Sequence, residues 1–402
     1  MQLVAYGAQD IYLTGNPQIT FFKVVYRRHT NFSMEAIEQT WNGPSNSAGR
    51  CVSTISRNGD LINRIYLELT GDLPASKAQS NAPSVGITDV ELEIGGQSID
   101  TQSGLFMEVY TELTEKNPSA FCGIASASNE INGTLFQNMS GMGGVGSTTA
   151  GGYTMKYFVP LLFWFCRNPG LALPLIALQY HEVKIILNHT FGSSGPLTSV
   201  TNRLWCDYIF LDTDERRRFA QVSHEYLIEQ IQEQELKTTA AGGTSTTSLK
   251  FNHPVKELIW TCSSDHTVVT AGGAGNQKGS LLKVATSPVD YLIKLNGHER
   301  FSARDSRYFT RTQIWQHHSG PGGLNSKIGE RLRGQLNDSI GVYSFALNPE
   351  DHQPSGTCNF SRIDEAEFLA TGSGSSAADK IFAINYNVLR IMSGMGGLAY
   401  SN

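Results

Sequence analysis

Two His-Glu pairs are the first residues of this chain whose types and spacing could perform chemistry. The pairs at 181–182 and 224–225 each begin the pattern HExxH, in which two histidines one helical turn apart bind zinc and the glutamate acts as a base. Both patterns fail at their last position, where Ile185 and Ile228 stand, and both lie in strand-like sequence. The sequence therefore excludes a zinc protease of this kind at either place.

A second candidate for metal binding is the pair His317-His318. No cysteine or carboxylate stands at ligand spacing beside it, so the favoured interpretation is a solvated loop pair. The six cysteines lie too far apart along the chain to form a CxxC metal or redox motif. We expect them to be reduced, buried thiols, with Cys166 and Cys206 inside apolar strands.

The glycine-rich stretches give no phosphate-binding or nucleophile motif. Residues 141–146 match GxGxxG, but no strand precedes them and no helix follows, as a dinucleotide site would require. No GxSxG or GxxxxGK sequence occurs, and carboxylate pairs such as Glu35/Glu38 carry no mark of an acid and base pair. We therefore predict no catalytic centre, no cofactor and no metal.

Charge and hydropathy exclude further classes of protein. The net charge is -5, and only 17% of residues are charged, against about 25% in a typical soluble domain. The one basic run, Arg216-Arg217-Arg218, is too short to hold nucleic acid against salt and fits a solvated helix face. Neither a secretory signal nor a membrane span is expected, because no apolar stretch is long enough.

Asn-X-Ser/Thr sequons are the remaining candidates for chemistry, here as glycan acceptors. Six occur, and Asn132 and Asn138 are the candidate glycosylation sites because they stand beside the glycine-rich loop that begins at Ser140. Similar Gly/Ser-rich stretches begin at Ala271 and Thr371. All three are expected to be exposed loop tips, since such composition buries little apolar surface.

The elements that position these residues follow a pattern that occurs twice. VELEIGGQSID and YLIKLNGHERF each run an alternating apolar strand into a tight turn, at Gly95-Gly96 and at Asn296-Gly297. Such turns need positive φ and are typical of β-hairpins. Downstream in each half, an aromatic-rich strand meets an Asn-Pro break, at Asn168-Pro169 and Asn348-Pro349. The order is kept, which indicates a duplicated all-β domain.

Short strands separated by turn-rich segments predict β-sandwiches in both halves. The predicted strands are 33–41, 61–69, 90–94, 157–165, 173–187, 204–211, 225–232, 255–262, 291–295, 342–347, 367–369 and 381–392. Trp164 falls inside one of them. Asn16 and Pro17 could begin a short helix or an arm, and Asp212 to Asp214 can cap a helix in a connector. We place the domains at 1–212 and 213–402.

At this point the sequence resembles a known family. The stretches that carry the resemblance span the chain from residue 5 to its end and include GAQDIYLTGNPQITFFKVVYRRHTNFSMEAI, DVELEIGGQSID, PGLALPLIALQYHEVK, DYIFLDTDERRRFAQ and NYNVLRIMSGMGGLAY. They are similar to the major capsid proteins of large icosahedral DNA viruses, closest to those of the algal chloroviruses.

The resemblance implies a double jelly roll: two eight-stranded antiparallel sandwiches in tandem, with short helices in the N-terminal arm and the connector. It implies a homotrimer that tiles the virion shell, contacts neighbouring capsomers and minor capsid proteins, and is assembled in the host cytoplasm. By position, residues 17–28 are the inner-facing arm, with Pro17, Phe21, Phe22, Tyr26, Arg27 and Arg28 as its candidate contact residues. Residues 212–221 are the connector, and the loops near 140 and 271 face outward.

Two alternatives stay open at this stage. The segment 263–287 is short for the family, so the chain is either a trimmed facet protein or a sister capsid protein used at special positions. A glycan-binding or glycan-processing double jelly roll is the rival function, because one fold can host several functions. That rival needs an acid pair or an aromatic platform, whereas the five tryptophans are scattered along the chain.

Overall fold

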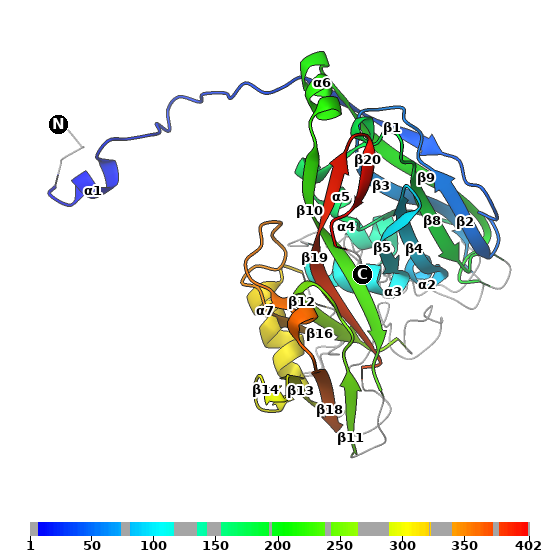
Figure 1. Ribbon diagram of the computed structural model, residues 1–402, viewed down its shortest axis with the longest axis vertical. Coiled ribbons are helices and arrows are strands. Elements are labelled where there is room, and N and C mark those ends of the chain that lie inside the picture. Colours follow the sequence, from blue (N-terminus) through cyan, green and yellow to red (C-terminus); the bar gives the residue numbers. More distant parts are fainter. Residues whose placement is uncertain are drawn as a thin grey trace, which may run out of the picture.

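Two β-sandwiches lie against each other, and an arm leaves the body at the N-terminal end (Figure 1). The structure is a computed structural model that describes residues 7–73, 81–115, 135–142, 154–192, 195–237, 243–263, 289–320, 322, 340–372 and 378–400.

The first sandwich is built from two antiparallel sheets. One sheet has the order β1 (Phe32–Gln39), β9 (Thr198–Leu211), β3 (Leu61–Asp72) and β6 (Thr154–Pro160), with β7 (Leu173–Pro174) beside β3. The facing sheet has the order β2 (Gly49–Thr54), β8 (Val183–His189), β4 (Ile87–Ile94) and β5 (Gln97–Ser103). Alternating positions of β3 and β4 are buried, as expected when one face of each sheet covers a shared core.

The second sandwich repeats this plan. One sheet has the order β10 (His224–Glu235), β19 (Lys380–Met392), β12 (Pro254–Thr261) and β16 (Gly341–Ser344), with β17 (Cys358–Asn359) and β20 (Met395–Leu398) at its margins. The other has the order β11 (Gly243–Ser248), β18 (Ala366–Gly372), β13 (Val289–Leu295) and β14 (His298–Glu299), with β15 (Arg304–Asp305) beside β13. In chain order, these strands occupy the same places as those of the first sandwich.

The two hairpins predicted from the repeat are confirmed. β4 turns into β5 at Gly95-Gly96, with φ of 59° and 84°, and β13 turns into β14 at Asn296-Gly297, with φ of 52° and 74°. Positive φ at both central residues matches the twist of the paired strands, which is why glycine or asparagine stands there. The described residues therefore form a double jelly roll with four principal strands in each sheet.

Helices lie at the ends and junctions of the sandwiches. They are α1 (Asp10–Thr14), α2 (Ala82–Gly86), α3 (Gly104–Thr114), α4 (Leu135–Ser140), α5 (Trp164–Arg167), α6 (Thr213–Gln221) and α7 (Gln313–His317). Single 3-10 turns are η1 (Pro169–Leu171), η2 (Leu175–Ala177) and η4 (Phe360–Arg362), and η3 (Tyr308–Thr312) is a π-helical turn. Within the described part of the chain, none of these helices is long and apolar enough to cross a membrane.

Two predicted strands are wrong in their bounds. The segment 157–165 leaves the sheet at Pro160, and Trp164 and Cys166 lie on α5 instead of in a strand. The segment 173–187 is broken by η2 before β8 begins. Proline explains both breaks, because Pro160 and Pro174 have no N–H to donate to a ladder. Cys51, Cys206 and Cys262 are buried, and all described cysteines are free thiols.

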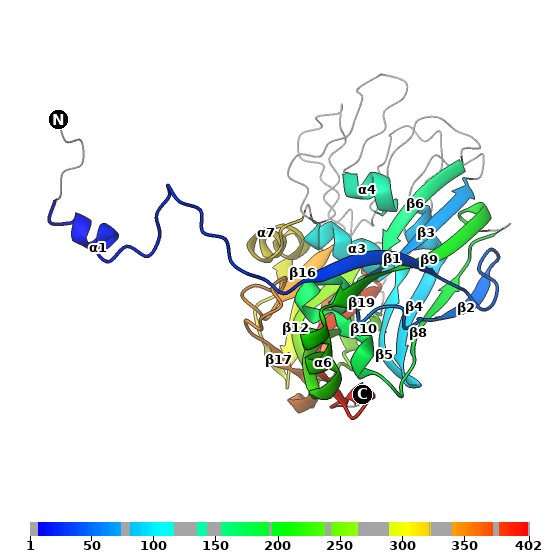
Figure 2. The same cartoon turned by 90° about the horizontal axis from the view of Figure 1, so that it is seen from above.

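The helix predicted to begin at Pro17 is also wrong. The arm has its helix at α1, residues 17–31 are extended apart from a turn at 21–22, and Asn16 has a left-handed φ of 50° in place of a cap conformation. The segment is rich in β-branched and aromatic residues, which lower helix propensity, and a short helix without a packing surface is unstable in water. The views in Figures 1 and 2 both show this arm projecting from the body.

The β10-β19-β12-β16 sheet is covered on both faces. Leu258 and Trp260 of β12 face the core of the second sandwich, whereas Ile259 joins the core of the first. Phe382 of β19 contacts Phe106 of α3, with ring centroids 5.4 Å apart. As a result β12 is buried from Val255 to Thr261, and the two sandwiches share one continuous apolar junction.

We predict that Gly341→Ala destabilises the second sandwich. A Cβ at this position would lie 2.3 Å from the indole nitrogen of Trp260, which is fully buried among Tyr291, Phe309 and Phe368. Overpacking of this kind lowers the free energy of unfolding by about 1–3 kcal/mol. The measurements are the thermal midpoint and the Trp fluorescence maximum.

Gly297→Ala is the matched control, because its Cβ would meet nothing within 4 Å and only the positive φ opposes it. We expect a loss of about 1 kcal/mol without a fluorescence change. An unshifted Trp signal in the Gly341 variant would contradict the packing argument.

Candidate functional site

Charged side chains are buried at the junction between the two sandwiches. Lys256 and Glu257 are adjacent on β12, and both are 0% exposed. Neighbouring strand residues normally point to opposite faces, but the pairing of β12 with β19 shifts register between Val255 and Glu257. Such a bulge re-aims one side chain, so that both charges reach the junction face.

A chain of ion pairs starts at Lys256 and crosses the junction. Its Nζ lies 2.7 Å from Glu229 Oε1 on β10 and donates to the Pro349 carbonyl at 2.6 Å. Arg167, on α5 of the first sandwich, approaches the other carboxylate oxygen of Glu229 to 2.8 Å through Nη1. The same nitrogen donates to Tyr110 Oη at 2.6 Å. One carboxylate therefore holds cations from both sandwiches.

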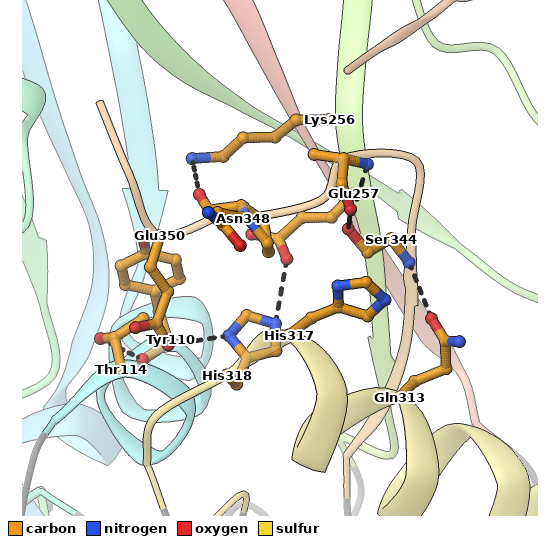
Figure 3. A network of polar contacts seen from close by, with 12 residues as sticks. Tyr110, Thr114, Lys256, Glu257, Gln313, His317, His318, Ser344, Asn348 and Glu350 are labelled. Carbon is orange, nitrogen blue, oxygen red and sulfur yellow. Dashed lines mark hydrogen bonds and ion pairs between the residues drawn. The ribbon is translucent and has the colours of Figure 1, made fainter. Parts of the chain in front are cut away.

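His318 forms a second bridge, directly after α7 (Figure 3). Its Nε2 lies 3.0 Å from Glu257 Oε2, and its Nδ1 lies 3.2 Å from Glu350 Oε1. The imidazole side chain is 0% exposed. Because a carboxylate flanks each ring nitrogen, the charged form of the ring with two N–H donors fits this site.

The segment after His318 caps the end of α3 in the first sandwich. The Gly320 N–H donates to the Leu113 carbonyl at 2.8 Å, and Ser319 Oγ lies 3.3 Å from the Thr114 carbonyl. Ser319 also donates to Glu350 through its N–H and its hydroxyl, at 2.8 and 2.7 Å. The last carbonyls of a helix lack partners within the helix, so this segment satisfies them.

The electrostatics of the junction favour charged pairs. Burial alone would lower the pKa of His318, but Glu257 and Glu350 raise it to about 9. Burial opposes ionisation of Glu229, yet Arg167 and Lys256 hold its pKa below the ordinary value. The pKa of Glu350 is likewise lowered, against its burial, by His318 and Ser319. Three cations thus balance three carboxylates, which is how buried charges are tolerated.

A cleft of about 830 Å³ opens beside this network. Arg167, Tyr110, Glu229 and Glu350 line it, together with residues 160–162 at the end of β6. Nearby, burial raises the pKa of Asp100 to about 6, while the Ile231 N–H donates to its Oδ1 at 3.0 Å.

This arrangement supports structure and not catalysis. Each carboxylate of the network is engaged by a cation, so none is set apart as a proton donor next to an ionised partner. No group of three or more metal-binding side chains occurs in the described residues. The network fixes how one sandwich sits on the other.

The sequence prediction for the histidine pair is wrong for His318. His317 is exposed and lies 3.0 Å from the Leu347 carbonyl through Nδ1, whereas its neighbour is enclosed between two glutamates. Those glutamates are distant in the sequence, so spacing could not reveal them. The partial signal was Lys256-Glu257, two opposite charges inside the otherwise apolar run VKELIW.

The other predicted site residues lie away from this junction. Arm side chains are exposed, with Phe21 at 86%, Phe22 at 98% and Tyr26 at 80%. Pro17, Arg27 and Arg28 are exposed as well. Asn138 belongs to α4, and Asn132 lies outside the described residues, as do the predicted loop at 271–279 and most of the loop that begins at Ser140.

Comparison with known families covers nearly the whole chain. The family described as large eukaryotic DNA virus major capsid protein matches residues 215–397, and the family described as major capsid protein N-terminus matches residues 20–212.

Individual relatives agree with these matches. The chain is 50% identical to the major capsid protein of Pyramimonas orientalis virus and 39% identical to that of Paramecium bursaria Chlorella virus 1, over 100% of this chain and 99% of each relative. A quasi-atomic structure of the PBCV-1 virus capsid is 36% identical, with a TM-score of 0.77 over 95% of this chain and 100% of that one. The Faustovirus major capsid protein, at 13% identity, shares the fold with a TM-score of 0.64 over 96% of this chain and 94% of that one.

We predict that the junction weakens at high pH through His318. Its pKa is raised from 6.5 to about 9, so the stabilisation is complete below pH 6.5 and is lost as the pH rises through 9. A shift of this size corresponds to roughly 3 kcal/mol. Thermal midpoints of the purified protein should therefore fall between pH 7 and pH 10, and His318→Gln should already be destabilised at pH 7 and fall less over that range.

His317→Gln serves as the control, since this neighbouring ring is exposed and forms no ion pair within the described residues. It should keep the wild-type pH profile. Identical profiles for the two variants would count against the His318 bridge.

Proposed function

The chain belongs to the major capsid protein family of large eukaryotic DNA viruses, and we propose that three copies form a pseudo-hexagonal capsomer. As a member of this family it is a structural component of the virion capsid and not an enzyme. The observation that carries the trimer proposal is the repeat of one strand order in both sandwiches. Three chains with two similar lobes each give six lobes around one axis, which is the shape of a tile for a flat facet.

The proposed domains are residues 1–212 and 213–402. In the described residues, no sheet takes strands from both sides of this boundary. The family matches also end at residue 212 and resume at residue 215. These observations support a boundary at the start of α6, although the two cores are continuous across the junction.

We assign the arm to the inner side of the shell, with minor capsid proteins as its partners. The support is its composition and exposure: Phe21, Phe22 and Tyr26 stand in water next to Arg27 and Arg28. An extended apolar segment of this kind is an aggregation hazard unless another surface covers it. Contact with partners in an assembled shell would remove that hazard.

The outer loops are the proposed place for glycans, at Asn132 and Asn138, and assembly is proposed to occur in the host cytoplasm. Both asparagines stand in Asn-X-Ser/Thr sequons next to the glycine-rich stretch. Peptide mass spectrometry of the virion protein would test each asparagine separately.

The first prediction concerns native mass. With a chain of 44.0 kDa, the purified protein should run near 132 kDa, three times 44.0, and should keep that mass on dilution. Obligate interfaces that bury on the order of 2,000 Å² or more resist dissociation in this way. Sedimentation velocity over a hundredfold range of concentration is the measurement. A stable species of 44 kDa would overturn the trimer.

The second prediction separates the capsomer from the shell. Phe21→Ser with Phe22→Ser should leave the native mass unchanged and abolish the formation of lattices, because the arm projects away from both sandwiches. Phe21→Leu with Phe22→Leu keeps apolar surface and should assemble. Electron microscopy of both variants is the test, and lattices of the serine variant would exclude a role for the arm.

A further inference from the structure

A second cavity, of about 420 Å³, lies between the connector helix α6 and the start of β10. We call it the connector pocket, defined by Glu215, Phe219, Val222, His224 and Tyr226, with Arg218 and Glu225 at its margins. Three rings form a stacked wall: the centroids of Phe219 and His224 are 5.3 Å apart, and those of His224 and Tyr226 are 6.0 Å apart. Val222 is 52% exposed.

One acidic group in this pocket lacks a partner. Glu215 Oε2 is buried, and no group in the described residues forms a hydrogen bond with it. Glu225 differs, because it pairs with Arg390 at 2.8 Å. A carboxylate oxygen withdrawn from water requires a donor, preferably a cation. An aromatic wall beside an unpartnered acid therefore fits a ligand with an aromatic ring next to a guanidinium.

The N-terminal arm carries such a pair and begins beside this pocket. Phe32, where the arm joins β1, pairs with Leu211 at the end of β9, two residues before α6 begins. Upstream of Phe32, the arm presents Tyr26 followed by Arg27 and Arg28, all exposed. No ion pair involves either arginine among the described contacts.

We propose that the connector pocket binds residues 26–28 of the arm of a neighbouring copy. Tyr26 packs against Val222 and the ring wall, and Arg27 or Arg28 pairs with Glu215. This proposal rests on the proposed function, because it needs copies held side by side in a shell, and it names a partner for the arm that the capsomer proposal does not.

A second copy fits better than the same chain. Both views show the arm leaving the body and pointing away from α6, not folding back along it (Figures 1 and 2). Fully extended, the 15 residues 17–31 reach about 50 Å, which is enough to cross to a neighbour. Each copy also presents its arm root and its pocket at the same end, so the two surfaces lie at one level in a layer of copies.

The test is disulfide cross-linking between two full-length chains with different tags. One carries Tyr26→Cys and the other Val222→Cys, and the two are mixed at the concentration where lattices form and then mildly oxidised. We expect a covalent heterodimer near 88 kDa, twice 44.0. In the matched control, Asp214→Cys replaces Val222→Cys, since Asp214 is exposed on α6 and does not line the pocket.

Charge substitutions test the ion pair separately. Glu215→Gln in the pocket chain should lower the cross-linking yield roughly tenfold. Glu215→Arg should abolish cross-linking, and Arg27→Glu with Arg28→Glu in the arm chain should restore it. Equal yields for Val222→Cys and Asp214→Cys, or no cross-link at all, would overturn the proposal. Cross-linking only within a chain that carries both cysteines would also overturn it, because the pocket would then hold its own arm.

The native mass of each variant separates this proposal from the capsomer. A mass near 132 kDa without the cross-link leaves the trimer standing and excludes the docking. The cross-link without a trimer does the reverse. Because a folded trimer is required for the first result, failure to fold cannot be mistaken for failure to dock.

Discussion

The fold depends on one constraint: the β10-β19-β12-β16 sheet is covered on both faces. One face closes the core of the second sandwich, and the other is packed against α3 and the core of the first. Charges on the covered face cannot reach water, so each needs a partner from the opposing sandwich or from its loops. The pairing of Lys256, Arg167 and His318 with three glutamates meets that need.

The direction of these ion pairs matters for a shell protein. Apolar contact alone allows many relative orientations of two lobes, whereas ion pairs with fixed geometry are satisfied in few. Arg167 and Glu229 connect the sandwiches on one side of the junction, and the segment 318–320 caps α3 on the other. Two attachments resist rotation better than one. A rigid pair of lobes suits a tile that must meet identical neighbours at every edge.

Duplication explains why the junction is built from equivalent elements. α3 follows the β4-β5 hairpin, and the η3 and α7 helices follow the corresponding β13-β14 hairpin. Each half therefore contributes the same kind of helical insertion at the point where the sandwiches meet. The two copies have nevertheless diverged: α3 is almost entirely buried, while Trp315 of α7 is 81% exposed. This asymmetry leaves the second sandwich with free apolar surface that the first lacks.

Local patterns in the sequence determined the strands, the two hairpins, the duplication and the capsid family, because alternation and positive-φ turns depend on neighbouring residues. Tertiary structure alone decided that His318 is buried and charged, since Glu257 and Glu350 come from distant segments. It also decided the bulge that turns Lys256 toward Glu229, and the extended form of residues 17–31, for which no packing surface stabilises a helix. A buried charge is defined by partners brought together through folding, which sequence spacing does not record.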